Sequence, residues 1–213
     1  MIGDRYASLQ AVAGVVSRET FERLEAFEGI FLRWAARINL SAPSTLNDLW
    51  TRHILDSAQL AGITKEGPIS HWVDIGTGGG FPGAVLAILA EEQKTRSLSL
   101  VESNGKKAAF LRSALADLAP RAEIICERAE DYIAEHPAPQ AMSARALANL
   151  SSLVSLSEPW LARETIGYFH KGRDYRGELQ LAHDTWNLDL IQHQSAVDVE
   201  SVILEIRSVR RKG

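Results

Sequence analysis

The sequence predicts an α/β fold in which a mostly parallel sheet is covered by helices on both faces. Short apolar runs alternate with amphipathic segments from residue 69 onward, which is the pattern of repeated strand–helix units. A glycine-rich stretch directly follows the first of these runs. Of the 213 residues, 46% are hydrophobic and 23% are charged, a composition that supports one sizeable core and excludes disordered and fibrous chains.

We expect the first 62 residues to form a helical cap. From Ser17, a suitable N-cap, apolar side chains recur at the three-to-four spacing of a helix with one buried face, at Phe21, Leu24, Phe27, Phe31, Trp34 and Ile38. Pro43 interrupts this pattern, and a second helical stretch runs from about residue 45 to residue 62. We therefore divide the chain into an N-terminal helical cap, residues 1–62, and a main domain, residues 63–213.

The main domain is expected to contain seven strands. Strands at 71–75, 98–101, 123–126, 140–144 and 166–170 alternate with helices at 84–90, 106–118, 151–161 and 175–186. Residues 188–194 and 202–209, separated by a polar stretch, predict a C-terminal antiparallel hairpin. In such sheets the functional site lies at the carboxyl ends of the strands.

Charge and composition limit the partners and the location that we expect. The net charge is −4, from 23 Lys and Arg against 27 Asp and Glu, and this argues mildly against a nucleic-acid partner. No apolar run approaches the roughly 18 residues that span a bilayer, and no signal-peptide pattern opens the chain, so we expect a cytoplasmic protein with no membrane partner. The single Cys126 cannot form an internal disulfide, and the spacing of His and Cys predicts no metal site.

The most informative segment is VDIGTGGGFPG, residues 73–83. Four of the five residues from Gly76 to Gly80 are glycine, and Pro82 follows where a helix can begin without the missing N–H. Glycines admit positive φ and leave the backbone open to close approach by a ligand. A merely tight turn needs only one or two glycines, so this strand–turn–helix predicts a ligand-binding loop.

Two ligands fit this loop. Gly78, Gly80 and Gly83 satisfy G-x-G-x-x-G, and Glu102 follows about twenty residues later, a pattern found in nicotinamide-binding folds. However, Asp74 lies within the strand that leads into the loop, and a carboxylate there suits an ammonium group better than a pyrophosphate of the same charge. Taken alone, Glu102, at the end of the next apolar run, is just as often a solvated acid that begins a loop.

The pattern Asp-x-Gly-x-Gly-x-Gly resembles the first motif of class I S-adenosylmethionine-dependent methyltransferases, which have a Rossmann-like fold. The resemblance implies that the loop, with Asp74, Gly76, Gly78 and Gly80, receives the methionine part of the cofactor and that Glu102 holds the ribose. It also implies that Ala129 and Glu130, after the third strand, face the adenine. Taken alone, acids that begin a helix more often compensate its dipole.

Further motifs narrow the class. Trp34 with INLS at 38–41, RHILDS at 52–57, DIGTGGGFPG at 74–83, SARA at 143–146 and Lys171-Gly172 occur in one order. Together they resemble the bacterial ribosomal RNA small-subunit methyltransferase G family, also called glucose-inhibited division protein B, over about residues 20–180. The resemblance implies methylation of a guanine N7 in 16S ribosomal RNA and cofactor contacts at Gly76, Phe81, Ala129, Glu130 and Arg145. Ala144 and His170 depart from the residues usual in that family.

This reaction assigns roles to several side chains. N7 carries a lone pair and no proton, so no general base is expected, and Arg145 is expected to position the cofactor or the target nucleotide near the methyl group. Lys171 and Arg173 are candidates for RNA contact. Asn39 either lines the target pocket or caps a helix. His53 and Asp56, three apart on a helix, are expected to form a structural network that ties the cap to the sheet.

The acidic total leaves room for an RNA-binding face, because the bases are grouped while several acids belong to the expected cofactor site. The basic groups are Arg33, Arg37 and Arg52; Lys106, Lys107 and Arg112; Lys171, Arg173 and Arg176; and Arg207, Arg210, Arg211 and Lys212. We expect a monomer that acts on 16S ribosomal RNA or the small subunit. Two alternatives remain at this point: a methyltransferase for a small molecule or protein, and a non-catalytic ribosome-binding factor.

Overall fold

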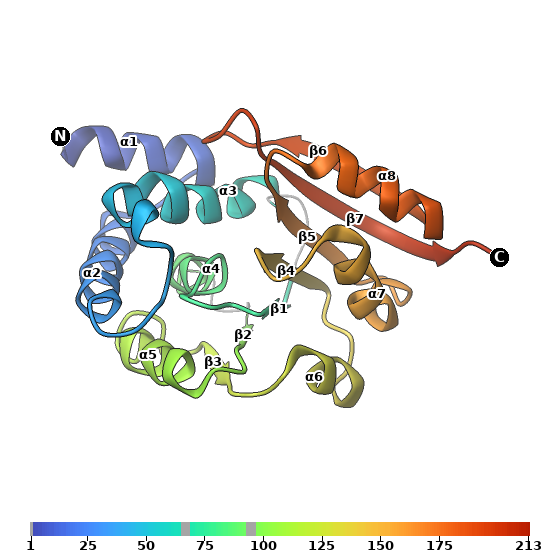
Figure 1. The fold of residues 1–213 in the computed structure, drawn as a ribbon. Helices are drawn as coiled ribbons and strands as arrows, with labels where there is room; N and C mark the ends of the chain where they lie inside the picture. The colour runs from blue at the N-terminus through green and yellow to red at the C-terminus, as the bar shows by residue number, and fades with distance from the viewer. Residues whose placement is uncertain (1, 65–68, 93–96) are drawn as a thin grey trace.

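The computed structural model describes residues 2–64, 69–92 and 97–213 (Figure 1). Its centre is one seven-stranded sheet with the order β3-β2-β1-β4-β5-β7-β6. The strands are β1 His71–Ile75, β2 Ser97–Val101, β3 Glu123–Ile125, β4 Ala141–Arg145, β5 Ile166–Lys171, β6 Trp186–Gln194 and β7 Val202–Arg211. β1 to β5 are parallel, and β7 is antiparallel to both β5 and β6. The predicted fold class and the C-terminal hairpin are confirmed.

Helices alternate with the parallel strands as the sequence predicts. They are α4 Gly83–Ala90, α5 Gly105–Leu115, α6 Ala129–Glu135, α7 Leu150–Leu161 and α8 Tyr175–Thr185. Two of them begin at asparagine caps: Asn104 Oδ1 accepts from the backbone N–H groups of Lys106 and Lys107, and Asn149 Oδ1 from that of Ser152. Such caps fix where each helix leaves the carboxyl edge of the sheet.

The N-terminal region is more elaborate than predicted. The sequence analysis missed α1 Ile2–Ala13, whereas it placed α2 Arg18–Ala35 correctly, with Ser17 Oγ accepting from Thr20 N at 3.1 Å. The second predicted helix is three consecutive pieces: the 3₁₀ helix η1 Pro43–Asp48, the π-helical turn η2 Trp50–Leu55 and α3 Asp56–Ile63. A π-turn widens the helix locally and changes which side chains share a face.

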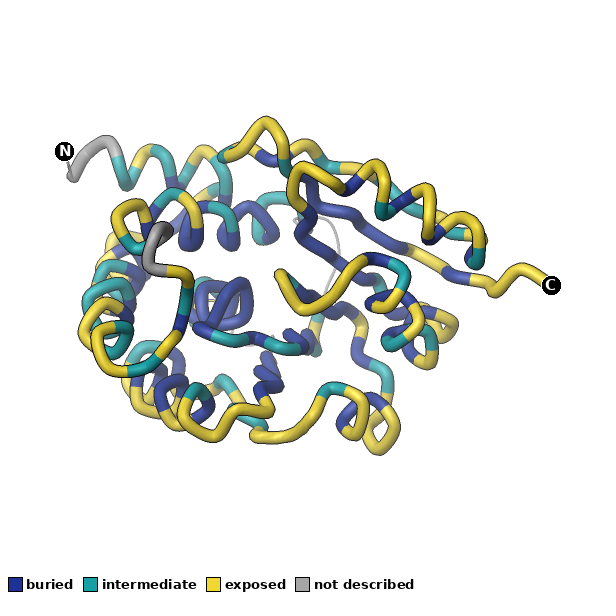
Figure 2. The backbone as a smooth tube through the Cα atoms, viewed as in Figure 1, coloured by how far each residue is buried: buried dark blue, intermediate teal, exposed yellow. Residues whose placement is uncertain are grey.

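Alternating residues on each strand supply two hydrophobic clusters, one on each face of the sheet. Trp72 and Ala141 belong to the cluster under α4 and α5, whereas Val73 and Met142 belong to the cluster under α6, α7 and α8. Seven of the eight residues of α4 are buried, and Figure 2 shows this helix enclosed between the N-terminal helices and the sheet. Helix α4 can be apolar on all of its faces because the N-terminal helices and the sheet bury it on every side.

The N-terminal helices share the first cluster with the sheet. Phe27 and Phe31 of α2 pack against Phe81 of the glycine-rich loop and Phe110 of α5, with ring centroids 5.2–6.3 Å apart. The expected domain boundary at residue 62 therefore lies within one continuous hydrophobic core. Within the described ranges, no helix is both long enough and apolar enough to cross a bilayer.

Replacing Phe27 by Ala tests this shared core. Phe27 is fully buried, so the variant should lower the free energy of unfolding by about 3–5 kcal/mol in a single cooperative transition, measured by urea denaturation. Leu32→Ala on the exposed side of the same helix is the control and should change it by less than about 0.5 kcal/mol. Two separate transitions in the wild type would show that the cap folds independently.

Candidate functional site

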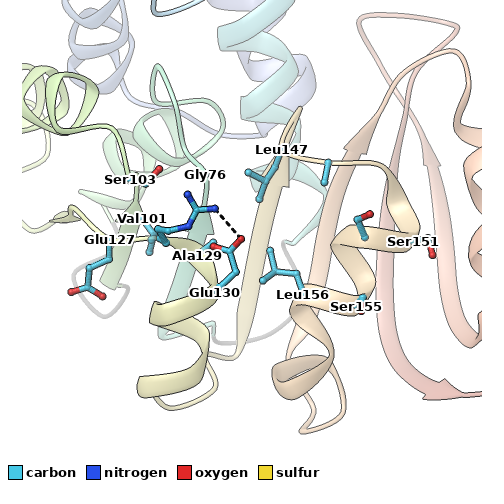
Figure 3. A pocket seen from close by; sticks show the side chains of 13 residues that line it. Gly76, Val101, Ser103, Glu127, Ala129, Glu130, Leu147, Ser151, Ser155 and Leu156 are labelled. Atoms are coloured by element: carbon cyan, nitrogen blue, oxygen red, sulfur yellow. Dashed lines mark hydrogen bonds and ion pairs between the residues drawn. The ribbon is translucent and has the colours of Figure 1, made fainter.

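A pocket of about 730 Å³ opens at the carboxyl ends of β1, β2 and β4 (Figure 3). Gly76 forms its base, Val101 and Ser103 come from the end of β2, and residues 127–130 form one wall. Leu147 and Leu156, together with serines of α7, form the opposite wall. The pocket lies beside β1 and β4, where the strand order reverses, which is the expected position of a ligand site in this architecture.

The glycine-rich loop has the backbone that its sequence predicts. Gly76, Gly78 and Gly80 have φ values of +63°, +60° and +95°, in the region that side chains rarely adopt. A Cβ at Gly80 would also lie 2.7 Å from the Cβ of Ala84. The loop therefore exposes main chain to the pocket at Gly76 and packs main chain against α4 at Gly80.

Asp74 lies beneath this loop. Its partner in the β1–β4 register is Ser143, whose Oγ donates to Asp74 Oδ1 at 2.6 Å. Gly83 N donates to Oδ2 at 3.0 Å, and Thr77 Oγ1 donates to the same oxygen. Burial raises the pKa of Asp74 to about 6, although these three hydrogen bonds act in the opposite direction. The carboxylate points into the loop instead of the pocket, so the structure favours an organising role over the expected contact with the cofactor.

Glu102 joins the loop to the end of β2. Its Oε2 accepts from Gly78 N at 2.8 Å, and its Oε1 accepts from Asn104 N at 2.7 Å. Each carboxylate oxygen can accept a further hydrogen bond, so Glu102 can hold hydroxyl groups while it retains the loop. The sequence analysis expected Glu102 to hold the ribose, and its position at the strand end is compatible with that role.

Ala129 and Glu130 lie on the pocket wall, as expected, at the start of α6. Arg128 Nη2 donates to Glu130 Oε1 at 3.3 Å, and a backbone hydrogen bond together with this arginine lowers the pKa of Glu130.

The opposite wall of the pocket, which includes Leu147, Ser151 and Leu156, was not predicted from the sequence. Their place in the chain could have indicated this wall, because they lie in the loop and helix that follow β4, whose carboxyl end lies at the same edge of the sheet.

Arg145, at the end of β4, connects the sheet to the N-terminal helices. Its Nη1 donates to Asp56 Oδ2 at 2.7 Å and to the backbone carbonyl of Arg52 at 3.1 Å, and its Nη2 contacts His53 Nδ1. The His53 ring stacks on Phe81 with centroids 4.9 Å apart. The expected network between the cap and the sheet is present. In it, His53 and Asp56 are connected through Arg145. Burial, with help from the Arg145 guanidinium, lowers the pKa of His53 to about 4, so this ring is neutral at pH 7.

A second cavity of about 680 Å³ lies on the far side of residues 145–148. It is lined by parts of η1 and η2, the end of β5 and the β6–β7 turn, and it meets the first pocket at Ala148. Phe81 lines neither space and is buried between α2 and Arg145, so the structure gives it a packing role.

Of the three residues expected to contact RNA, Lys171 lines the second cavity, whereas Arg173 and Asn39 line neither cavity. Lys171 is buried, and its Nζ donates to Glu178 Oε2 at 2.8 Å and to the carbonyl of Ala148 at 2.7 Å. Arg173 is exposed and pairs with Glu200 at 2.6 Å. Asn39 is exposed in the loop after α2 and lines neither cavity. The partner of Lys171 comes from α8, the next helix along the chain, and the partner of Arg173 comes from the β6–β7 turn.

The first pocket fits the cofactor that the sequence resemblance implies. S-adenosylmethionine carries hydroxyl groups, an amine-bearing base and a cationic sulfonium. The pocket offers Gly76 main chain without a Cβ and the Glu130 carboxylate on its wall, and Glu102 lies between the lining residues Val101 and Ser103. Acceptors and negative charge are what such a ligand requires.

Replacing Asp56 by Asn tests the network. The variant loses the charge that pairs with a largely buried guanidinium, so the free energy of unfolding should fall by about 1–3 kcal/mol, measured by thermal and chemical denaturation. Asp117→Asn, at an exposed site, should leave it unchanged. An unaltered melting temperature for Asp56→Asn, combined with loss of methylation, would contradict the structural role.

Gly83→Ala tests the packing around Asp74. A Cβ there would lie 2.6 Å from both Asp74 Oδ2 and Thr77 Oγ1, so we expect a loss of about 1–3 kcal/mol in unfolding free energy. Gly177→Ala in α8 is the matched control, because its Cβ would enter open space and should add about 0.5–1 kcal/mol. Equal stability of the two variants would rule out a close-packed loop.

Comparison with known proteins agrees with this geometry. The family model described as rRNA small subunit methyltransferase G matches residues 20–207. The ribosomal RNA small subunit methyltransferase G of Chelativorans sp. is 52% identical over 99% of this chain and all of its own length, and that of Brucella anthropi is 50% identical over 98% and 97%. The solved structure of a SAM-dependent O-methyltransferase from Thermotoga maritima covers 86% of this chain and 73% of its own with a TM-score of 0.56 at 14% identity, which shows the shared fold. The chain therefore belongs to the rRNA small subunit methyltransferase G family.

Proposed function

We propose that this protein transfers the methyl group of S-adenosylmethionine to N7 of a guanine in 16S ribosomal RNA. Membership of the family assigns it to methylation of small-subunit ribosomal RNA with this cofactor. The observation that best supports a base as the acceptor is the second cavity, which meets the cofactor pocket at Ala148. A methyl donor in one space and an acceptor in the other would meet at that wall.

The chemistry does not require a general acid–base pair. When bound, S-adenosylmethionine supplies an activated methyl group on a sulfonium. Guanine N7 has a lone pair ready for in-line attack, so the protein's work is alignment and exclusion of water. The ionisable groups where the two cavities meet are suited to alignment of the reactants. Arg145 is paired with Asp56, Lys171 is paired with Glu178, and His53 is neutral.

We assign Arg145 a positioning role. It shapes the wall between the two spaces through Asp56, His53 and the carbonyl of Arg52. Its guanidinium also lies 5.5 Å from the centre of the Phe81 ring, next to the glycine-rich loop. Any movement of this side chain would shift both the loop and the N-terminal helices, and misalignment by about 1 Å is enough to slow such a reaction strongly.

We further propose that the protein acts as a cytoplasmic monomer on ribosomal RNA or the small subunit. Several basic groups expected from the sequence remain exposed, including Arg37, Arg52, Lys106 and the C-terminal group Arg210, Arg211 and Lys212. Scattered positive charge on an acidic protein gives weak non-specific affinity and favours recognition by shape.

The decisive measurement follows methyl transfer from tritiated S-adenosylmethionine. The purified protein is incubated with naked 16S RNA, with small subunits lacking the modification and with a metabolite and protein extract, and each fraction is digested to nucleosides. We expect label in 7-methylguanosine from an RNA fraction. Glu102→Gln should reduce it strongly, because the carboxylate loses an acceptor oxygen at the cofactor site. Glu135→Gln, exposed on α6, is the control.

Three outcomes would contradict the proposal in different ways. Label in a metabolite or protein would favour the alternative class of methyltransferase. No label in any fraction, with the protein bound to small subunits, would favour a non-catalytic ribosome-binding factor. Label in RNA at another atom would retain the substrate and overturn the assignment to N7.

A further inference from the structure

The second cavity has an unusual balance of charge. Three cations and four carboxylates line it: Arg52, Arg145 and Lys171, and Asp48, Asp56, Glu178 and Asp198. Arg145 pairs with Asp56, and Lys171 pairs with Glu178. Asp198 closes the β6–β7 turn, where its two oxygens accept from Glu200 N and Ser201 Oγ. Two charged side chains of this lining, Asp48 and Arg52, have no ion pair with any residue that the structure describes.

A buried acceptor lies in the same wall. His170 is 8% exposed, and its Nε2 donates to the backbone carbonyl of Asp56 at 3.1 Å. Its Nδ1 therefore carries a lone pair, and this atom is buried with no hydrogen-bond partner among residues 2–64, 69–92 and 97–213. The cavity therefore offers a ligand the Asp48 carboxylate as an acceptor that has no ion pair among the described residues, so its ligand should present donors.

Guanine presents the required donors. Its Watson–Crick edge carries the N1–H and the 2-amino group side by side, and one carboxylate can accept from both. Adenine and cytosine carry a ring acceptor at the corresponding place, and a carboxylate would repel it. N7 lies on the Hoogsteen edge of the purine, so a guanine held through N1–H and the 2-amino group leaves N7 free.

The placement of the two walls suits that orientation. Asp48 comes from η1 in the N-terminal region, whereas the junction with the cofactor pocket lies at Ala148, after β4. Arg52 follows Asp48 by four residues and is exposed, so its guanidinium is available to a phosphate of the chain that carries the base. A guanine held between these walls would turn its Watson–Crick edge toward Asp48 and its N7 toward the junction at Ala148.

We propose that the second cavity receives the target guanine, that Asp48 reads its N1–H and 2-amino group, and that Arg52 holds an adjacent phosphate. This inference rests on the proposed function, because it places the acceptor of the same reaction. It makes Asp48 the residue that determines base specificity and Arg52 a residue that contributes affinity without specificity.

The test replaces the target guanosine by inosine, which lacks only the 2-amino group. Once the methylated nucleotide is mapped with the wild type, 16S RNA carrying either base at that position is assembled into small subunits. We compare kcat/KM for guanosine and inosine with the wild type, Asp48→Ala and the nearly isosteric Asp48→Asn. Any intrinsic difference in N7 reactivity between the two bases is common to all enzymes and cancels when their ratios are compared.

We expect the guanosine-to-inosine ratio of the wild type to exceed that of Asp48→Ala by about tenfold or more, the effect of a hydrogen bond to a charged group. Asp117→Ala, an exposed control outside both cavities, should keep the wild-type ratio. Arg52→Ala should lower kcat/KM equally for both bases and reduce the salt dependence of RNA binding. Melting curves check that all variants are folded.

Failure of this inference is distinguishable from failure of the proposed function. If the wild type forms 7-methylguanosine but its guanosine-to-inosine ratio equals those of both Asp48 variants, Asp48 does not read the base and the inference is wrong. If the wild type forms no 7-methylguanosine in RNA, the proposed function itself has failed.

Discussion

The buried carboxylate of Asp74 organises the carboxyl edge of the sheet. The β1–β4 register places it beside Ser143, and its two oxygens then collect hydrogen bonds from strand β4, the glycine-rich loop and the start of α4. A carboxylate without these donors would be costly to bury, and the raised pKa of Asp74 reflects that burial. The loop is thereby held in its left-handed conformations by the protein's own contacts.

A second set of contacts makes the N-terminal helices part of the site. Arg145 binds three groups of the η2–α3 region, and Gln59 of α3 accepts from Ala196 N in the β6–β7 turn. The short segment after Arg145 separates the two cavities, and it contains Ala146 with φ of +54°, a conformation that costs a residue with a Cβ about 1 kcal/mol or more. The wall between the two cavities is therefore a strained backbone segment, and an ion pair holds it at one end. Both constraints favour a single defined geometry of this wall.

Local patterns predicted most of the fold and only part of the site. Strand and helix spacing located the elements of the sheet, and the glycine-rich loop, Ala129 and Glu130 lie at the pocket because backbone direction alone brings them there. The π-helical turn has no sequence signature, and α1 lacks a regular apolar stripe, so both were missed. The role of a charged side chain depends on its neighbours: Lys171 and Arg173 look available in the sequence but meet Glu178 and Glu200 after folding. Asp74 was expected to contact the cofactor, but the direction of its carboxylate depends on Ser143 of the neighbouring strand.

The position of β7 has a consequence for how the molecule is made. β7 follows β6 along the chain but lies between β5 and β6 in the sheet, and the described pairings of β6 are with β7. During synthesis β6 therefore emerges from the ribosome before the strand with which it pairs, and it must wait unpaired until β7 is complete. The turn between them also lines the second cavity, so the lining of that cavity is synthesised completely only after the lining of the first pocket.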